Sequence, residues 1–133
     1  MSRENVEIVR RMIAAFVEGD YERLVELFDP QIEYDVSRTS PESRVAHGHE
    51  ELAEVIEQWL ATWDDHRLEL VELIDAGDER VVALMREHGK MKGSDTWVEH
   101  QVGVLFTLRD GRITRYEEYQ DTAGALEAAG LRE

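Results

Sequence analysis

Apolar residues recur at intervals of three and four through the first half of the chain, which predicts three amphipathic helices. The first ends at Gly19, the second follows Asp20, a residue suited to cap it, and ends before Pro30, and the third starts at His49. We expect Trp59 and Trp63 to face the interior from the third helix. The apolar faces comprise Val6, Val9, Ile13, Phe16 and Val17, then Tyr21, Leu24, Val25 and Phe28, then Leu52, Val55, Ile56, Trp59, Leu60 and Trp63.

Alternating apolar and polar residues predict strands in the rest of the chain. A short strand turns Tyr34 and Val36 inward and Asp35 outward. Residues 67–74, 80–91, 96–109 and 112–120 are rich in β-branched and aromatic residues and are separated by Gly and Asp turns, which predicts an antiparallel meander. Residues 37–48 read as a long polar loop at the mouth of the fold.

The order of these elements predicts an α+β fold. A last helix, capped by Asp121 or Thr122 and stopped at Gly130, joins the three N-terminal helices around a cone-shaped, strongly curved mixed or antiparallel sheet, a cystatin-like roll. A length of 133 residues with 42% apolar side chains suits one core, so we expect a single domain over residues 1–133.

Charge and composition exclude several classes of function. Thirty acidic and fifteen basic residues give a net charge of −15, which argues against nucleic acid or an anionic membrane as a partner. The chain has no cysteine, so it has no disulfide and no thiolate nucleophile. It also lacks a long apolar run and a signal peptide, so we expect a cytoplasmic protein with no membrane contact.

Residues at the joints between the predicted elements resemble the nuclear transport factor 2-like superfamily, particularly its SnoaL-like polyketide cyclase, limonene epoxide hydrolase and ketosteroid isomerase branches. They are the Gly19-Asp20 corner, Leu27-Phe28-Asp29-Pro30, Gly48, Asp110-Gly111-Arg112-Ile113 and Tyr116-Glu117-Glu118-Tyr119-Gln120-Asp121. The resemblance implies a pocket for a small, largely apolar molecule, acid–base chemistry without a cofactor, and a homodimer formed through the sheet. The superfamily hosts several activities on one scaffold, so fold alone does not select one.

Strand alternation, combined with the register of this resemblance, predicts which side chains face the pocket. Arg86, His88, His100 and Glu118 then lie close together on an otherwise apolar wall. Because a buried charge is costly unless it is paired, we expect Arg86 to bond to Glu118. Such a group can perform acid–base chemistry; alternatively, it is an ion pair on a solvated face beside histidines that merely pack. The full inward set is Val82, Leu84, Arg86, His88, Val98, His100, Val102, Val104, Phe106, Tyr116, Glu118 and Gln120.

The branches of the superfamily imply different roles for these positions. Compared with the epoxide hydrolases, Tyr34 and Arg86 match, Glu118 stands in place of the first Asp, and Val36 and His88 replace an Asn and the second Asp. Compared with the ketosteroid isomerases, Val36 stands where the general base belongs, unless a one-residue gap puts Asp35 there, and Met12 and an apolar or Gly residue near Gly103 replace the oxyanion donors. Compared with the cyclases, Glu118 is the first candidate for the acid–base residue and Asp121, otherwise a helix cap, the second.

Aromatic and long apolar side chains are candidates for contacts with a ligand, although each can equally be ordinary core. His47 and His49 lie near Glu50 and Glu51, but no third ligand is evident, so we predict no metal and no cofactor. An accessory or ligand-binding domain without turnover is the alternative function, with Trp97, Met85 and Val81 on the outward face of the sheet as a dimer contact. The predicted ligand contacts are Trp59, Trp63, Met12, Phe16, Phe106 and Tyr116.

Overall fold

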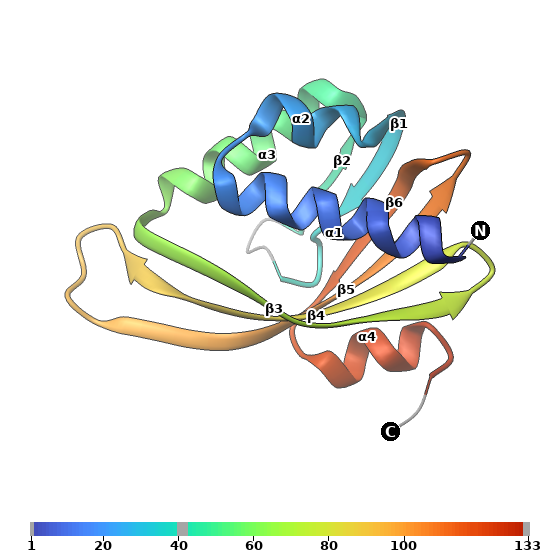
Figure 1. The fold of residues 1–133 in the computed structure, drawn as a ribbon. Helices are drawn as coiled ribbons and strands as arrows, with labels where there is room; N and C mark the ends of the chain where they lie inside the picture. The colour runs from blue at the N-terminus through green and yellow to red at the C-terminus, as the bar shows by residue number, and fades with distance from the viewer. Residues whose placement is uncertain (1, 40–42, 132–133) are drawn as a thin grey trace.

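The structure, a computed structural model, describes residues 2–39 and 43–131 (Figure 1). Its helices are α1 (Ser2–Glu18), α2 (Tyr21–Glu26), α3 (Gly48–Ala61) and α4 (Thr122–Ala128). Its strands are β1 (Phe28–Asp35), β2 (Val45–His47), β3 (Trp63–Gly77), β4 (Arg80–Met91), β5 (Trp97–Arg109) and β6 (Arg112–Tyr119). Figure 1 shows α1, α2 and α3 over one face of a curved sheet and α4 on the opposite face.

One sheet contains all the strands of the described residues, in the order β2-β1-β6-β5-β4-β3. Strands β3 to β6 form an antiparallel meander, whereas β1 runs parallel to β6. The predicted α+β class with a mixed, curved sheet is therefore confirmed. None of the helices in the described part of the chain is long and apolar enough to cross a lipid bilayer.

Apolar side chains are buried on both faces of the sheet. The larger cluster lies under the N-terminal helices and includes Val9, Ile13, Leu52 and Phe106. A smaller cluster holds α4 on the outer face and consists of Val82, Leu84, Leu105, Ala125, Leu126 and Ala129. At Gly103, a Cβ atom would lie 2.6 Å from Ala125 Cβ and 2.9 Å from the Asp121 carbonyl oxygen, so this close approach of α4 requires glycine.

The predicted helices and their caps are present, but some helix and strand boundaries differ from the prediction. Asp20 accepts a bond from the Arg23 N–H at 3.2 Å and Asp121 one from the Gly124 N–H at 2.7 Å, so both act as the predicted caps. Val17, which the spacing assigns to the apolar face of the first helix, is 58% exposed. Trp63 begins β3 instead of ending α3, and β2 lies within the predicted loop, of which residues 40–42 fall outside the described residues.

The predicted inward face of β4 is wrong. Val81, Ala83 and Met85 pack in the inner cluster, and Glu87 lines the inner cavity described below. Val82 and Leu84 face outward and pack under α4. Because both faces of this part of β4 are covered, its residues are apolar throughout, and the pattern does not show which of them face inward. Of the predicted dimer contacts, Val81 and Met85 are therefore internal, whereas Trp97 is 51% exposed.

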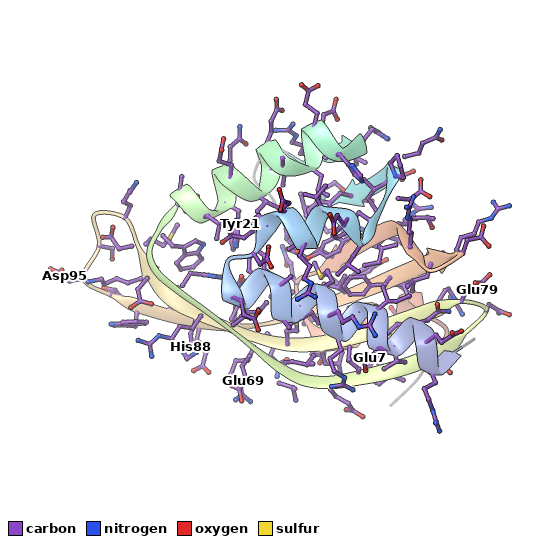
Figure 2. All side chains as sticks on the ribbon, turned by 45° about the horizontal axis from the view of Figure 1, so that its top comes forward. Glu7, Tyr21, Glu69, Glu79, His88 and Asp95 are labelled. Carbon is purple, nitrogen blue, oxygen red and sulfur yellow. The ribbon has the colours of Figure 1, made fainter. Side chains whose placement is uncertain are left out.

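Arg86 and His88 consequently lie on the outer face of the sheet. Arg86 pairs with Glu69 at 3.4 Å and with Glu99 at 3.5 Å, so the predicted bond between Arg86 and Glu118 is wrong. Figure 2 shows His88 and Glu69 on the opposite side of the sheet from Tyr21 of α2. Neither Arg86 nor His88 lines the cavity.

Candidate functional site

A cavity of about 680 Å³ lies between the N-terminal helices and the inner face of the sheet. Most of its wall is apolar, from residues of α1, α3 and the long strands. Five of the six predicted ligand contacts line it: Met12, Phe16, Trp59, Phe106 and Tyr116. Trp63 does not; it is 8% exposed and packs edge-on against Trp59 at a ring distance of 5.4 Å. Such a cavity, with few polar groups, is the usual form of a small-molecule site.

The first polar group of the cavity wall centres on Glu118 of β6. The Tyr116 hydroxyl donates to Glu118 Oε1 at 2.7 Å, and Thr39 Oγ1 donates to Oε2 at 2.7 Å. The parallel pairing of β1 and β6 sets Tyr34 beside Tyr116, and their rings stack with centroids 4.0 Å apart. We call Tyr34, Thr39, Tyr116 and Glu118 the Glu118 group.

Burial, together with the negative charge of Glu87, raises the pKa of Glu118, although the donors Thr39 and Tyr116 and the nearby His100 oppose this shift. Burial and the charge of Glu118 also raise the pKa of Tyr34 and of Tyr116 well above the ordinary value of 10.0. The two phenols therefore stay neutral donors. Glu118 is a stronger base than an exposed carboxylate and remains partly open to the cavity.

The second polar group centres on Glu87 of β4, which is only 7% exposed. His66 Nε2 lies 2.7 Å from Glu87 Oε2, and His100 Nε2 lies 2.9 Å from Oε1. β4 and β5 pair Glu87 directly with His100, and β3 brings His66 in from the other side. We call these three residues the Glu87 group.

The Glu87 group was only partly predicted: His100 was expected at the site, whereas Glu87 and His66 were not. His66 precedes the stretch predicted as a strand, and Glu87 was assigned to the outer face. The usable signal lay in the hairpin, because a turn that pairs Lys90 with Trp97 sets Glu87, not His88, opposite His100.

The end of β1 resolves the choice between Asp35 and Val36. Val36 lines the cavity, whereas Asp35 accepts bonds from the Ser37 N–H at 2.9 Å and Ser37 Oγ at 2.6 Å and pairs with Arg38 at 3.5 Å. Burial alone would raise the pKa of Asp35, but the Ser37 bonds and the charges of Arg38 and Arg115 lower it below the ordinary value. Asp35 is thus a turn residue outside the cavity.

The backbone of His47 and the ring of His49 have structural partners. The His47 N–H donates to Glu51 at 2.8 Å, and the His49 ring bonds to the Phe28 carbonyl oxygen at 2.9 Å. Within residues 2–39 and 43–131, no cluster of three His, Asp or Glu residues is arranged to hold a metal ion. The absence of a metal in the working protein stays a prediction.

Arg44 is a lining residue that the sequence did not suggest. It reaches the cavity wall from just before β2 and pairs with Glu54 at 3.1 Å on α3. Its guanidinium also lies 3.4 Å from the Gln58 side-chain oxygen. Because Arg44 is held by two partners on α3, it ties the segment before β2 to the helix beside the cavity.

Comparisons with known proteins agree with this architecture. Residues 9–116 match the family described as SnoaL-like domain. An uncharacterized protein of Mycobacterium tuberculosis is 26% identical over 93% of this chain and 94% of its own length. A crystal structure of an NTF2-like protein of unknown function from Burkholderia pseudomallei superposes with a TM-score of 0.80, at 22% identity over 96% of this chain and 97% of that one. TerC, co-crystallized with polyporic acid, gives a TM-score of 0.77 at 22% identity over 96% and 98% of the two chains.

Proposed function

Because the chain belongs to the family of SnoaL-like domains, as its resemblance to the nuclear transport factor 2-like superfamily predicted, we propose that it binds a small, largely apolar molecule and transfers a proton with Glu118, without a cofactor. The reaction would be of the cyclase, isomerase or hydrolase type. One observation carries the proposal: a carboxyl group of raised pKa, held by two hydroxyl donors, faces an apolar cavity of about 680 Å³.

The proposed chemistry follows from the surroundings of Glu118. A general base works best when its pKa approaches the working pH, and burial moves Glu118 in that direction. The bonds from Thr39 and Tyr116, each 2.7 Å long, fix the carboxyl group relative to the wall. Tyr34, which also lines the cavity, offers a neutral hydroxyl to an oxygen atom on which negative charge develops.

The binding part of the proposal draws support from the fold. TerC, which resembles this chain in fold, was co-crystallized with polyporic acid. The predicted ligand contacts Met12, Phe16 and Phe106 lie on the cavity wall together with Glu118. A ligand that fills this space would gain about 25 cal/mol of favourable free energy for each Å² of apolar surface that it buries.

A binding domain without turnover is the second candidate function. Both oxygens of Glu118 already accept a hydrogen bond of 2.7 Å, which is how a purely structural buried carboxylate is satisfied. In that case Glu118 would shape the cavity and ligands would leave unchanged. Binding and turnover therefore have to be measured separately.

The experiment compares wild type, Glu118→Gln and Glu117→Gln. Glu117 is a matched control, because it precedes Glu118 on β6 but pairs with Arg115 at 3.6 Å outside the cavity. A thermal-shift screen against epoxides, enones, aromatic polyketide esters and lactones finds ligands, since a ligand at 100 times its Kd adds about 2.7 kcal/mol. Ligands with an enolisable carbonyl are then incubated in D₂O, and deuterium uptake at carbon is followed by NMR.

We expect wild type and Glu117→Gln to catalyse deuterium uptake and Glu118→Gln to bind without doing so. Binding with no uptake by any of the three proteins would favour the binding domain. No binding by any ligand class would contradict the small-molecule function itself.

We also infer a homodimer in the cytoplasm, as the resemblance implied. Trp97 supports the pairing, because its ring is half exposed on the outer face, with Arg67 5.5 Å from the ring centre. Sedimentation of wild type and Trp97→Glu tests it; a monomeric wild type would contradict the pairing.

A further inference from the structure

The Glu87 group acts on Glu118 only through its charges and makes no hydrogen bond to it, yet a buried carboxylate with two imidazole partners is costly to desolvate. A carboxylate that is 7% exposed needs strong partners, and Glu87 has a ring nitrogen of His66 or His100 on each oxygen. The two imidazoles differ in access. The side chain of His66 is 9% exposed, whereas that of His100 is 47% exposed and lines the cavity.

Aromatic rings close off His66. Trp63, Trp59 and Phe16 approach it with ring distances of 5.1, 6.0 and 6.1 Å. His66 thus holds Glu87 in place from behind and does not meet a ligand. Of the two imidazoles, His100 is the one that a ligand can contact.

The bond to Glu87 also sets which atom His100 presents. An ionised carboxylate only accepts hydrogen bonds, so Nε2 of His100 carries the proton that it donates across 2.9 Å. In the neutral ring, Nδ1 then keeps its lone pair and is an acceptor. Within the described residues no protein donor bonds to Nδ1. His100 lines the cavity, so Nδ1 is the ring atom left to accept a hydrogen bond from a hydroxyl group of a ligand.

The two polar groups are separated along the sheet by apolar wall. On β5, His100 pairs with Glu87 and Val104 pairs with Glu118, and the intervening Val102 lines the cavity. A molecule that reaches both groups must therefore be elongated, with an apolar middle and a polar function at each end. That shape is more specific than the largely apolar ligand proposed above.

We infer that His100, positioned by Glu87, binds a hydroxyl, phenol or enol group at the end of the ligand remote from Glu118. This inference rests on the proposed function, because it takes the end at Glu118 to be an enolisable carbonyl. His100 is the ligand-binding residue. Glu87 is a positioning residue that fixes the tautomer and the orientation of the His100 ring, and His66 supports Glu87.

The test uses three probes with one skeleton: 2-acetylnaphthalene and its 6-hydroxy and 6-methoxy derivatives. Each has a methyl ketone for the Glu118 end, but only the hydroxy compound can donate a hydrogen bond at the other end. Kd is measured by calorimetry for wild type, His100→Phe, Glu87→Gln and His88→Gln. His88 is the matched control, a histidine next to Glu87 on β4 that does not line the cavity.

The readout is the preference for hydroxyl over methoxy, a ratio in which general damage to the cavity cancels. We expect wild type and His88→Gln to prefer the hydroxy probe about tenfold, the size of a net hydrogen bond to an oriented acceptor. The preference should vanish in His100→Phe and fall in Glu87→Gln, whose amide no longer fixes the Nε2–H tautomer. A merely structural Glu87 would weaken all three probes alike and leave the ratio unchanged.

Other outcomes separate this inference from the function on which it rests. If Glu118→Gln stops deuterium uptake by the methyl ketone while wild type shows no hydroxyl preference, the inference is wrong and the proposed function stands. If the preference depends on His100 and Glu87 but uptake does not depend on Glu118, the ligand assignment stands and the catalytic role of Glu118 is wrong. If none of the probes binds at millimolar concentration, the ligand class is wrong.

Discussion

The two polar groups of the cavity have the same plan but different partners. In each, a carboxyl group in an apolar wall receives a hydrogen bond on both oxygens. Glu118 is bonded by hydroxyl groups, from Tyr116 and Thr39, whereas Glu87 is bonded by imidazoles, from His66 and His100. Neutral hydroxyl groups donate hydrogen bonds but do not take up a proton near neutral pH, whereas an imidazole can.

This difference suggests a division of labour. With neutral donors around it, the carboxyl group of Glu118 is the proton acceptor of its own group, and burial raises its pKa. At Glu87 the carboxyl group orients other groups that can accept a proton. The first arrangement suits a general base and the second a positioned binding group, so substitutions at the two carboxyl groups should act differently.

The largest expected effect is on catalysis. Replacing a general base typically lowers the rate by about 10²- to 10⁴-fold. We expect this loss of deuterium uptake for Glu118→Gln with 2-acetylnaphthalene, and a loss below about tenfold for Glu87→Gln, because the methyl ketone of this probe is placed at Glu118. Equal losses in the two variants, measured by NMR at saturating probe, would contradict the division of labour.

Stability should show the opposite order. In Glu87→Leu the buried imidazole N–H of His66 loses its acceptor, at a cost of about 1–3 kcal/mol, whereas the half-exposed His100 can turn to water. In Glu118→Leu the hydroxyl groups of Tyr116 and Thr39 can turn toward water in the cavity, so about 1 kcal/mol is expected. Urea unfolding with unchanged m values measures both. A larger loss for Glu118→Leu would reverse the comparison.

The sequence predicted the two groups unequally, for physical reasons. Tyr34, Tyr116 and Glu118 lie on strands with a clear alternation, and the family motif around Glu118 fixed the register of β6. On β4, the run from Val81 to Met85 is apolar throughout, because α4 covers the outer face. Periodicity could not tell its two faces apart there. The inward face was therefore assigned to His88 and not to Glu87.

The elements themselves were easier to predict than their registers. β4 spans Arg80–Met91 as predicted, and the N-terminal helices follow from their three- and four-residue spacing. β3 begins earlier than predicted, at Trp63, because aromatic residues suit a helix face and a strand equally well. Because of that error, His66 was not recognised as a strand residue facing the site. Aromatic residues occur in helices and in strands, so the boundary between α3 and β3 depends on contacts with residues distant in sequence.

A smaller effect is expected from Thr39, which tunes the basicity of Glu118. Its hydroxyl favours the ionised carboxylate, so Thr39→Val should raise the pKa of Glu118 further and move the pH midpoint of deuterium uptake upward. At a fixed pH below that midpoint the rate should fall by about tenfold or less. Thr62→Val is the control, because Thr62 also lines the cavity but bonds to the Gln58 carbonyl oxygen. A midpoint that moves downward would contradict the role of Thr39.

The smallest effect concerns stability as a function of pH. The pKa of Glu118 is raised in the folded state above its ordinary value of 4.5, so its contribution to stability is complete below that value and is lost as pH rises through the folded pKa. The Tm of Glu118→Gln relative to wild type should therefore increase with pH above about 4.5.

Asp35→Asn is the control of opposite sign. The pKa of Asp35 is lowered below 3.8, so its contribution is present above that value and is lost as pH falls through the folded pKa. If the Tm of both variants relative to wild type changed with pH in the same direction, the pKa of Glu118 would not be raised by burial. The proposed difference between Glu118 and Glu87 would then be wrong.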